Sequence, residues 1–160
     1  KIIINNISKI PKIEGRGSIH NVLLNNFKVR LIDQSYNANP ETMTESIKNF
    51  SMIKNNRRDK ILILGNMNEL GVKSYDHHIK VIKEIQKYQF DEVILSGDFF
   101  KKTLSINHKL KNNYVYKNSS QNIMSYLEKK LHKNAIIMAK CSNKTEVNKF
   151  VNLLKLQKER

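Results

Sequence analysis

The chain has 160 residues, of which 39% are apolar and one is a cysteine, and its formal net charge is +15. This length fits one ordinary domain with a buried core. The single cysteine, Cys141, excludes an intramolecular disulfide and a cysteine-rich zinc site, and it favours a reducing compartment. No apolar run approaches the roughly 18 residues of a membrane span, and residues 1–6 lack the apolar stretch of a signal peptide.

The positive charge comes from lysines that are spread along the whole chain. The sequence holds 24 Lys and 5 Arg, whereas contacts with base edges and bidentate contacts with phosphate favour Arg. Lys, Asn and Ile, whose codons are rich in A and T, are all abundant, so genome composition accounts for much of the excess. Nucleic acid is therefore not expected as a partner, and a stand-alone basic module that binds a polyanion stays as an alternative.

Short apolar runs alternate with segments of helical period. The predicted strands lie at 22–24, 29–33, 60–64, 92–95, 114–116 and 135–139. Several runs are continuously apolar, such as 61–64 (ILIL), which is typical of strands that are buried on both faces. The alternation predicts an α/β domain with a mainly parallel sheet.

Amphipathic helices are predicted between and after these strands. The first has Asn39 as N-cap and Pro40 as first residue, which are favoured at those positions. The apolar stripes of the predicted helices are Met43, Ile47, Phe50 and Ile53; Ile79, Ile82 and Ile85; Ile123, Leu127 and Leu131; and Val147, Val151 and Leu154. Such stripes predict core positions rather than ligand contacts.

The first 18 residues differ from the rest of the chain. They contain Pro11 and the turn sequence GRG at 15–17, which are typical of an extended segment. We expect either an entry segment or the tail of a preceding unit.

The densest group of polar side chains is the block 33–40 (DQSYNANP), which lies where a predicted buried strand ends and a helix begins. The carboxyl ends of strands form the usual ligand crevice in open α/β sheets. A carboxylate there can accept ribose hydroxyls, amides can donate and accept, and a helix start offers N–H groups to anions. The same residues also suit an ordinary capped turn, so both interpretations stay open.

Two further loops follow predicted buried strands. The first, 64–71 (LGNMNELG), allows close approach of a ligand but also suits a simple strand-to-helix loop; His77 and His78 follow it without the further ligands that a metal site needs. In the second, Lys140 and Ser142 could hold a carboxylate or a phosphate, and Cys141 lacks an evident base for nucleophilic chemistry. The sequence contains neither a GxxxxGK[ST] phosphate loop nor a GxGxxG fingerprint.

Taken together, the GRG turn at 15–17, the block 31–40 (LIDQSYNANP) and the block 64–71 with His78 resemble the carboxy-terminal part of the Mur ligases. The resemblance covers about residues 11–154. It implies a Rossmann-like, mostly parallel sheet flanked by helices, with residues 1–18 as the end of a central domain or a linker and residues 19–160 as the carboxy-terminal domain.

The resemblance also implies an activity. It is that of a three-domain cytoplasmic enzyme of peptidoglycan synthesis, which uses ATP to join UDP-N-acetylmuramoyl-tripeptide to D-alanyl-D-alanine through an acyl phosphate. In the family, the central domain holds the phosphate loop and Mg²⁺, and the amino-terminal domain holds the UDP moiety. ATP and Mg²⁺ are therefore expected to be held mainly outside this chain, whose partners would be those two domains; no metal ligand is predicted here.

The resemblance assigns roles to seven residues. Arg16 matches a catalytic arginine that reaches the ATP phosphates, and Asp33 matches an aspartate that faces the ribose. The residues expected at the nucleotide are Asp33, Tyr36, Asn37 and Asn39, and those expected on the side of the incoming substrate are Lys140 and Ser142.

Three positions depart from the family pattern: Gln34, where an acidic residue is common, Asn66, where Asp is common, and Cys141, where the family has Gly. If position 141 needs a positive φ, a Cβ there costs about 1 kcal/mol. These departures keep open the alternative of an inactive ligase fragment.

Overall fold

The computed structural model describes residues 14–54, 57–106 and 114–157. Six strands form one sheet in the order β1-β2-β6-β3-β4-β5. The strands are β1 (Ser18–Leu24), β2 (Phe27–Gln34), β3 (Asp59–Leu64), β4 (Glu92–Leu95), β5 (Val115–Tyr116) and β6 (Ala135–Lys140). Only β1 is antiparallel to its neighbour, so the predicted mostly parallel α/β sheet is confirmed.

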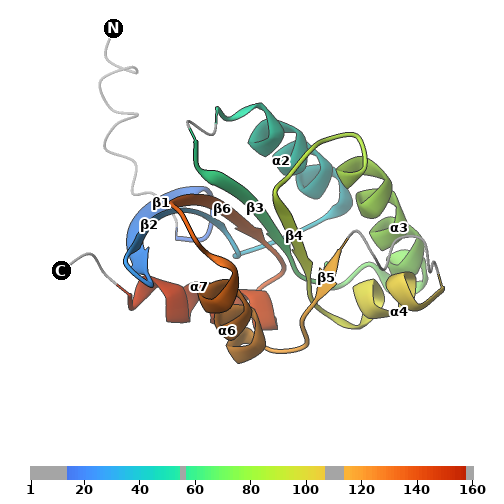
Figure 1. Ribbon diagram of the computed structural model, residues 1–160. Helices are drawn as coiled ribbons and strands as arrows, with labels where there is room; N and C mark the ends of the chain where they lie inside the picture. The colour runs from blue at the N-terminus through green and yellow to red at the C-terminus, as the bar shows by residue number, and fades with distance from the viewer. Residues whose placement is uncertain (1–13, 55–56, 107–113, 158–160) are drawn as a thin grey trace, which may run out of the picture.

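Helices cover both faces of this sheet (Figure 1). On one face lie α2 (Pro40–Met52), α3 (Ser74–Ile85) and α4 (Asp98–Ile106), and on the other lie α6 (Ser120–Lys130) and α7 (Glu146–Lys155). A short 3-10 turn, η1 (Gly71–Lys73), precedes α3. Because both faces are covered, the central strands are buried along their length: all six residues of β6 are buried.

The start of α2 follows the sequence prediction. Asn39 Oδ1 accepts a hydrogen bond from Thr42 N at 2.8 Å, Thr42 Oγ1 accepts one from Asn39 N at 3.3 Å, and Pro40 is the first helical residue. This reciprocal pair satisfies two N–H groups that the first turn leaves free. The turn is therefore well capped, whatever else it does.

Two helical predictions need correction, and one helix is not expected from the sequence. Ile53 is not part of the α2 stripe, because the helix ends at Met52 and Ile53 is its C-cap, 36% exposed. In α3 the place predicted for Ile79 at the core is taken by His78, which is fully buried. Helix α4 was not predicted, because its buried stripe includes the polar Thr103 and the helix has only nine residues.

All residues of the stripes predicted for α6 and α7 are buried, although Leu131 is the C-cap of α6 and lies just beyond the helix. An extended segment is predicted at 1–18, and its residues 1–13 lie outside the described part of the chain. Of the remainder, residues 14–17 form a turn and Ser18 already belongs to β1. In the part of the chain that the structure describes, no helix has the length and apolar character to cross a membrane.

Candidate functional site

The sheet has a crossover point beside β6. The helix that follows β2 covers one face of the sheet, whereas the helix that follows β6 covers the other. The register brings Gln34, Lys140 and Leu64 side by side at the carboxyl ends of β2, β6 and β3. Chain segments diverge at such a point and leave a crevice, which is the usual ligand site in open α/β sheets.

Asp33, at the end of β2, is a fully buried carboxylate. Its Oδ1 accepts hydrogen bonds from Ser35 N at 2.9 Å and Ser35 Oγ at 2.7 Å, and its Oδ2 forms an ion pair with Lys155 Nζ at 2.5 Å. Burial raises the pKa of Asp33, but the hydrogen bonds from Lys155 and Ser35 outweigh this effect and hold the pKa below its usual range. Asp33 thus fixes the loop that follows it; its contact with a ribose stays a prediction.

The turn at residues 14–17 lies against this loop. Gly17 N donates to Asp33 O at 2.7 Å, and Tyr36 N donates to Gly15 O at 3.2 Å. Gly15 has φ +76°, and a Cβ at this position would lie 2.9 Å from Cβ of Tyr36. Gly15 is therefore required both by its left-handed backbone and by the closeness of Tyr36.

Arg16 projects from this turn over the neighbouring loop. Its guanidinium carbon lies 4.7 Å from the centroid of the Tyr36 ring, and both side chains are exposed to solvent. A cation above the face of an aromatic ring is attracted by the ring electrons and loses some of its freedom. The structure thus brings together Arg16 and Tyr36, which are 20 positions apart.

A depression of about 370 Å³ lies beside Arg16. Four of the seven predicted residues line it: Arg16, Asn37, Asn39 and Lys140. The Lys140 side chain is almost buried, and its Nζ donates to Asn37 O at 3.2 Å. Burial lowers the pKa of Lys140, and no carboxylate within ion-pair distance of it occurs among the described residues. Four amide side chains and one carboxylate, Glu45, also line the depression, so its two cations leave one net positive charge, which suits an anionic ligand.

Ser142 lies apart from this depression and ties loops together. Its Oγ accepts from Asn68 N at 2.9 Å and is 3.5 Å from Ala38 O, while its N donates to Asn66 O at 3.0 Å. These contacts join the loops after β2, β3 and β6. A direct contact of Ser142 with substrate stays a prediction.

Cys141 packs into the core next to Ser142. It is fully buried, and burial raises the pKa of its thiol to about 12, so the thiolate needed for nucleophilic attack is not formed near neutral pH. Its φ is not positive, so the strain considered for a Cβ at this position does not arise. The side chain occupies space opposite Gly65, where a Cβ would lie 2.7 Å from Cβ of Cys141.

His78 has a structural role, as a lone helical histidine usually does. Its Nε2 accepts from Met67 N at 3.1 Å, and its Nδ1 is 2.6 Å from Ser74 O. Because a carbonyl only accepts, Nδ1 carries the proton and the ring is neutral. Burial lowers the pKa of His78, which favours this neutral form.

No group of three or more His, Cys, Asp and Glu side chains that could hold a metal lies within 14–54, 57–106 and 114–157.

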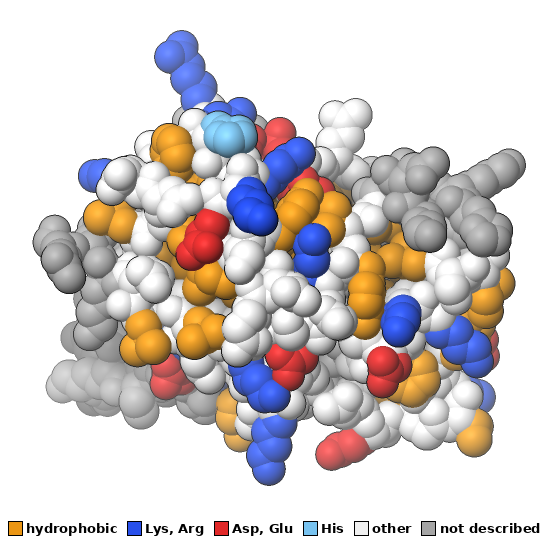
Figure 2. All heavy atoms as spheres, turned by 60° about the horizontal axis from the view of Figure 1, so that its bottom comes forward, with side chains coloured by type: hydrophobic (Ala, Val, Ile, Leu, Met, Phe, Trp, Pro, Cys, Tyr) orange, Lys and Arg blue, Asp and Glu red, His pale blue; other side chains and the backbone are white. Residues whose placement is uncertain are grey.

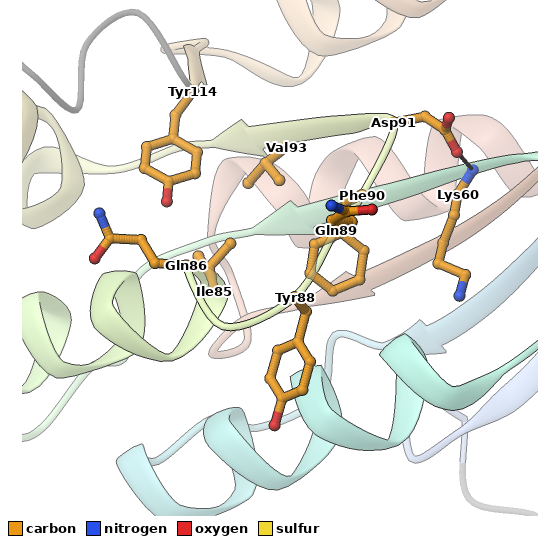
Figure 3. A pocket seen from close by; sticks show the side chains of 9 residues that line it. All are labelled: Lys60, Ile85, Gln86, Tyr88, Gln89, Phe90, Asp91, Val93 and Tyr114. Carbon is orange, nitrogen blue, oxygen red and sulfur yellow. Dashed lines mark hydrogen bonds between the residues drawn. The ribbon is translucent and has the colours of Figure 1, made fainter.

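A larger depression, of about 730 Å³, lies elsewhere (Figure 3). It is next to the amino ends of β3 and β4, and none of the seven predicted residues lines it. Lys60 N donates to Asp91 Oδ2 at 2.7 Å, and Lys60 Nζ donates to Ser51 O at 2.8 Å. The polar groups of Lys60 are thus already used within the fold.

The sequence of the chain is similar to sequences of known ligases. Residues 21–143 match the family model described as "Mur ligase, glutamate ligase domain". A UDP-N-acetylmuramoyl-tripeptide--D-alanyl-D-alanine ligase of Borreliella burgdorferi is 23% identical to the chain over 125 residues, which are 78% of this chain and 27% of that protein.

The fold is similar to that of solved ligase structures. A MurF structure from Acinetobacter baumannii matches with a TM-score of 0.77 and 16% identity, over 96% of this chain and 33% of that one. MurF from Thermotoga maritima in complex with ADP matches with a TM-score of 0.69 and 17% identity, over 96% of this chain and 33% of that one. The chain thus spans about a quarter to a third of the length of these relatives.

Proposed function

The chain belongs to the Mur ligase family, and from this premise we propose that it is the carboxy-terminal part of a ligase that adds D-alanyl-D-alanine to UDP-N-acetylmuramoyl-tripeptide. The intact enzyme would use ATP in the cytoplasm to make a peptidoglycan precursor. Its central and amino-terminal domains would be the partners of this chain and would hold Mg²⁺, the ATP phosphates and the UDP moiety. The ADP bound to the Thermotoga maritima relative is in keeping with ATP as substrate.

The observation that carries this proposal is the depression that four of the predicted site residues line together. Arg16 and Lys140 place two positive charges beside the amides of Asn37 and Asn39, at the crossover point of the sheet, where Glu45 contributes the one negative charge. ATP supplies the phosphoryl group that activates a carboxylate. Such chemistry depends on charged groups that are held in place before the negative charge of the transition state develops.

Within this chain each residue of the site has a separate proposed role. Arg16 is proposed to contact the phosphates, because it is the exposed cation at the rim of the depression. Asn37 and Asn39 are proposed to hold the nucleotide, and Tyr36 to hold Arg16. Lys140 is proposed to bind the anionic group of the activated substrate, while Asp33 and Ser142 keep the loops in place.

The one face of the molecule seen in Figure 2 gives no support to the alternative of a polyanion-binding module. On the face shown in Figure 2, Lys and Arg side chains lie singly among acidic, apolar and neutral ones, without a continuous basic stripe. Binders of nucleic acid usually gather these residues on one face or along one helix.

The experiment is Arg16→Ala in the intact polypeptide that contains this chain, with ADP release as the measurement. We expect turnover to fall about 100-fold or more, because a charge that stabilises the transition state is lost. Arg30→Ala is the matched control, since Arg30 is an exposed arginine of β2 outside the depression. Unchanged turnover in Arg16→Ala would refute the role of Arg16. Absence of ADP release from the unsubstituted protein would favour the inactive fragment.

A further inference from the structure

Lys155, in the last turn of α7, contacts two carboxylates at once. Its Nζ lies 2.5 Å from Asp33 Oδ2 and 2.8 Å from Glu14 Oε1. The three residues differ sharply in exposure: the side chain of Asp33 is fully buried, that of Lys155 is 15% exposed and that of Glu14 is 75% exposed. The ammonium thus connects the interior of the domain with the turn at residues 14–17.

Asp33 fixes the position of this ammonium. A fully buried carboxylate needs a counter-charge, and Lys155 is the only cation within 4 Å of it among the described residues. Burial lowers the pKa of Lys155, but the hydrogen bonds with Asp33 and Glu14 outweigh it, so that the pKa is raised. Lys155 is therefore already in place when Glu14 contacts it, and little side-chain freedom of the lysine is lost in forming the second contact.

Glu14 stands two residues before Arg16. The turn between them includes Gly15, with φ +76°, and Gly17, with φ +91°, follows Arg16. Glycines allow many backbone conformations, so this turn needs contacts that select one. Two backbone hydrogen bonds, to Asp33 O and from Tyr36 N, hold its inner side. The contact of Glu14 with Lys155 holds the first residue of the turn.

We propose that Lys155 is a positioning residue, which fixes the 14–17 turn and thereby sets the place of Arg16 at the depression. It does so through simultaneous contact with Asp33 and Glu14. The effect on ligase activity rests on the proposed role of Arg16, whereas the contact of Lys155 with Asp33 and Glu14 does not depend on that role. Sequence reasoning missed this residue because Asp33 and Lys155 are distant in the sequence and join only in the fold.

The first test uses the 160-residue chain and a protease that cleaves after arginine. Cleavage after Arg16 reports opening of the turn, and cleavage after the exposed Arg57 serves as an internal reference. Glu14→Gln removes the charge of an exposed residue and leaves the buried pair intact. We expect the ratio of the Arg16 rate to the Arg57 rate to rise about two- to fivefold, in line with the loss of one partly exposed ion pair.

Variants of Lys155 complete this test. Lys155→Met should raise the same ratio at least as much, and Glu14→Gln should add nothing further in that background. Lys155→Arg should restore most of the protection, because a guanidinium can also contact two carboxylates. If Lys155→Met does not fold, Lys155→Met combined with Asp33→Asn removes the unpaired buried charge, and Glu14→Gln alone still decides the question.

The matched control is Lys149→Met, which breaks the exposed pair of Lys149 with Glu146 on the same helix. It should leave the cleavage ratio unchanged. The proposal is overturned if Glu14→Gln leaves the ratio unchanged, or if Lys149→Met raises it equally.

The second test uses the intact ligase. Glu14→Gln should lower kcat/KM for ATP about two- to fivefold in the native background and have no effect in an Arg16→Ala background. A full effect in both backgrounds would overturn positioning through Arg16. The protease ratio is independent of ligase activity, so failure of the proposed function would leave the first test interpretable.

Discussion

The guanidinium of Arg16 rests over the face of the Tyr36 ring, 4.7 Å from its centroid. Tyr36 is 45% exposed, so it contributes little to the core. Its ring instead restricts a long, flexible cation that stands at the rim of the depression. This relationship connects the GRG turn with the loop after β2.

Tyr36→Leu should therefore weaken the function of Arg16 without unfolding the domain. We expect kcat/KM for ATP of the intact ligase to fall about two- to fivefold, which corresponds to the ~0.5–1 kcal/mol of an exposed cation–π contact. Tyr36→Phe keeps the ring and should keep the activity. Equal losses in both variants would show that the hydroxyl, rather than the ring, matters.

Asp33→Asn should destabilise the domain through Lys155. Loss of one partner from a buried pair costs about 3–5 kcal/mol. We expect a value at the lower end, since Lys155 is 15% exposed and keeps Glu14. Urea denaturation of the chain measures the free energy of unfolding. Lys149→Met, which breaks an exposed pair, should change this quantity by less than about 0.5 kcal/mol.

The pH dependence of this difference follows from the lowered pKa of Asp33. The unfolded state takes up a proton near the ordinary pKa of 3.8, whereas the native state takes it up only at lower pH. The stabilisation by Asp33 is therefore complete above pH 3.8 and lost as the pH falls through the native pKa. The difference in free energy of unfolding between native protein and Asp33→Asn should shrink over that interval. A difference that stays constant would show that charge plays no part.

The sheet and most helices were predictable because burial on two faces leaves a local trace in the sequence. The continuous run at 61–64 and the cap formed by Asn39 are examples of signals contained within a few residues. Helix α4 was missed because Thr103 replaces an apolar residue in its buried stripe, with its hydroxyl donating to Phe99 O at 2.8 Å. A polar residue whose hydroxyl is bonded within its own helix can be buried, but it interrupts the apolar repeat by which an amphipathic helix is predicted.

The site was predictable in part. Its composition could be found because Asn37 and Asn39 follow a buried strand directly, and because the family resemblance pointed to Arg16 and Lys140. The sequence could not show which of these residues line the depression and which instead hold the surrounding loops in place. The burial of Asp33 and the loop contacts of Ser142 depend on partners that lie far apart in the sequence.

His78 should make the stability of the domain sensitive to pH below its ordinary pKa of 6.5. Burial lowers the native pKa, so below pH 6.5 the unfolded state binds a proton that the native state does not. The free energy of unfolding should then fall with decreasing pH, by at most ~1.4 kcal/mol per pH unit from this group. Denaturation series between pH 5 and pH 8 measure the slope. In His78→Gln the slope should decrease, even if the variant is less stable throughout; an unchanged slope would assign the effect to other groups.

Gly65 and Cys141 should be coupled, because each limits the size of the other. A Cβ at Gly65 would lie 2.7 Å from Cβ of Cys141 and 3.1 Å from two carbons of Val147. The backbone of Gly65 does not have a positive φ, so the cost of Gly65→Ala arises from overlap alone. We expect a loss of about 1–3 kcal/mol, as for other overpacked cores.

Cys141→Gly removes the closest of these contacts. In that background Gly65→Ala should cost clearly less, because its new methyl group would enter the space left by the thiol side chain. Urea denaturation of the two single variants and the double variant gives the coupling energy. A coupling near zero would mean that the neighbouring Val147, rather than Cys141, sets the size limit at Gly65, and Val147→Ala would then relieve the strain instead.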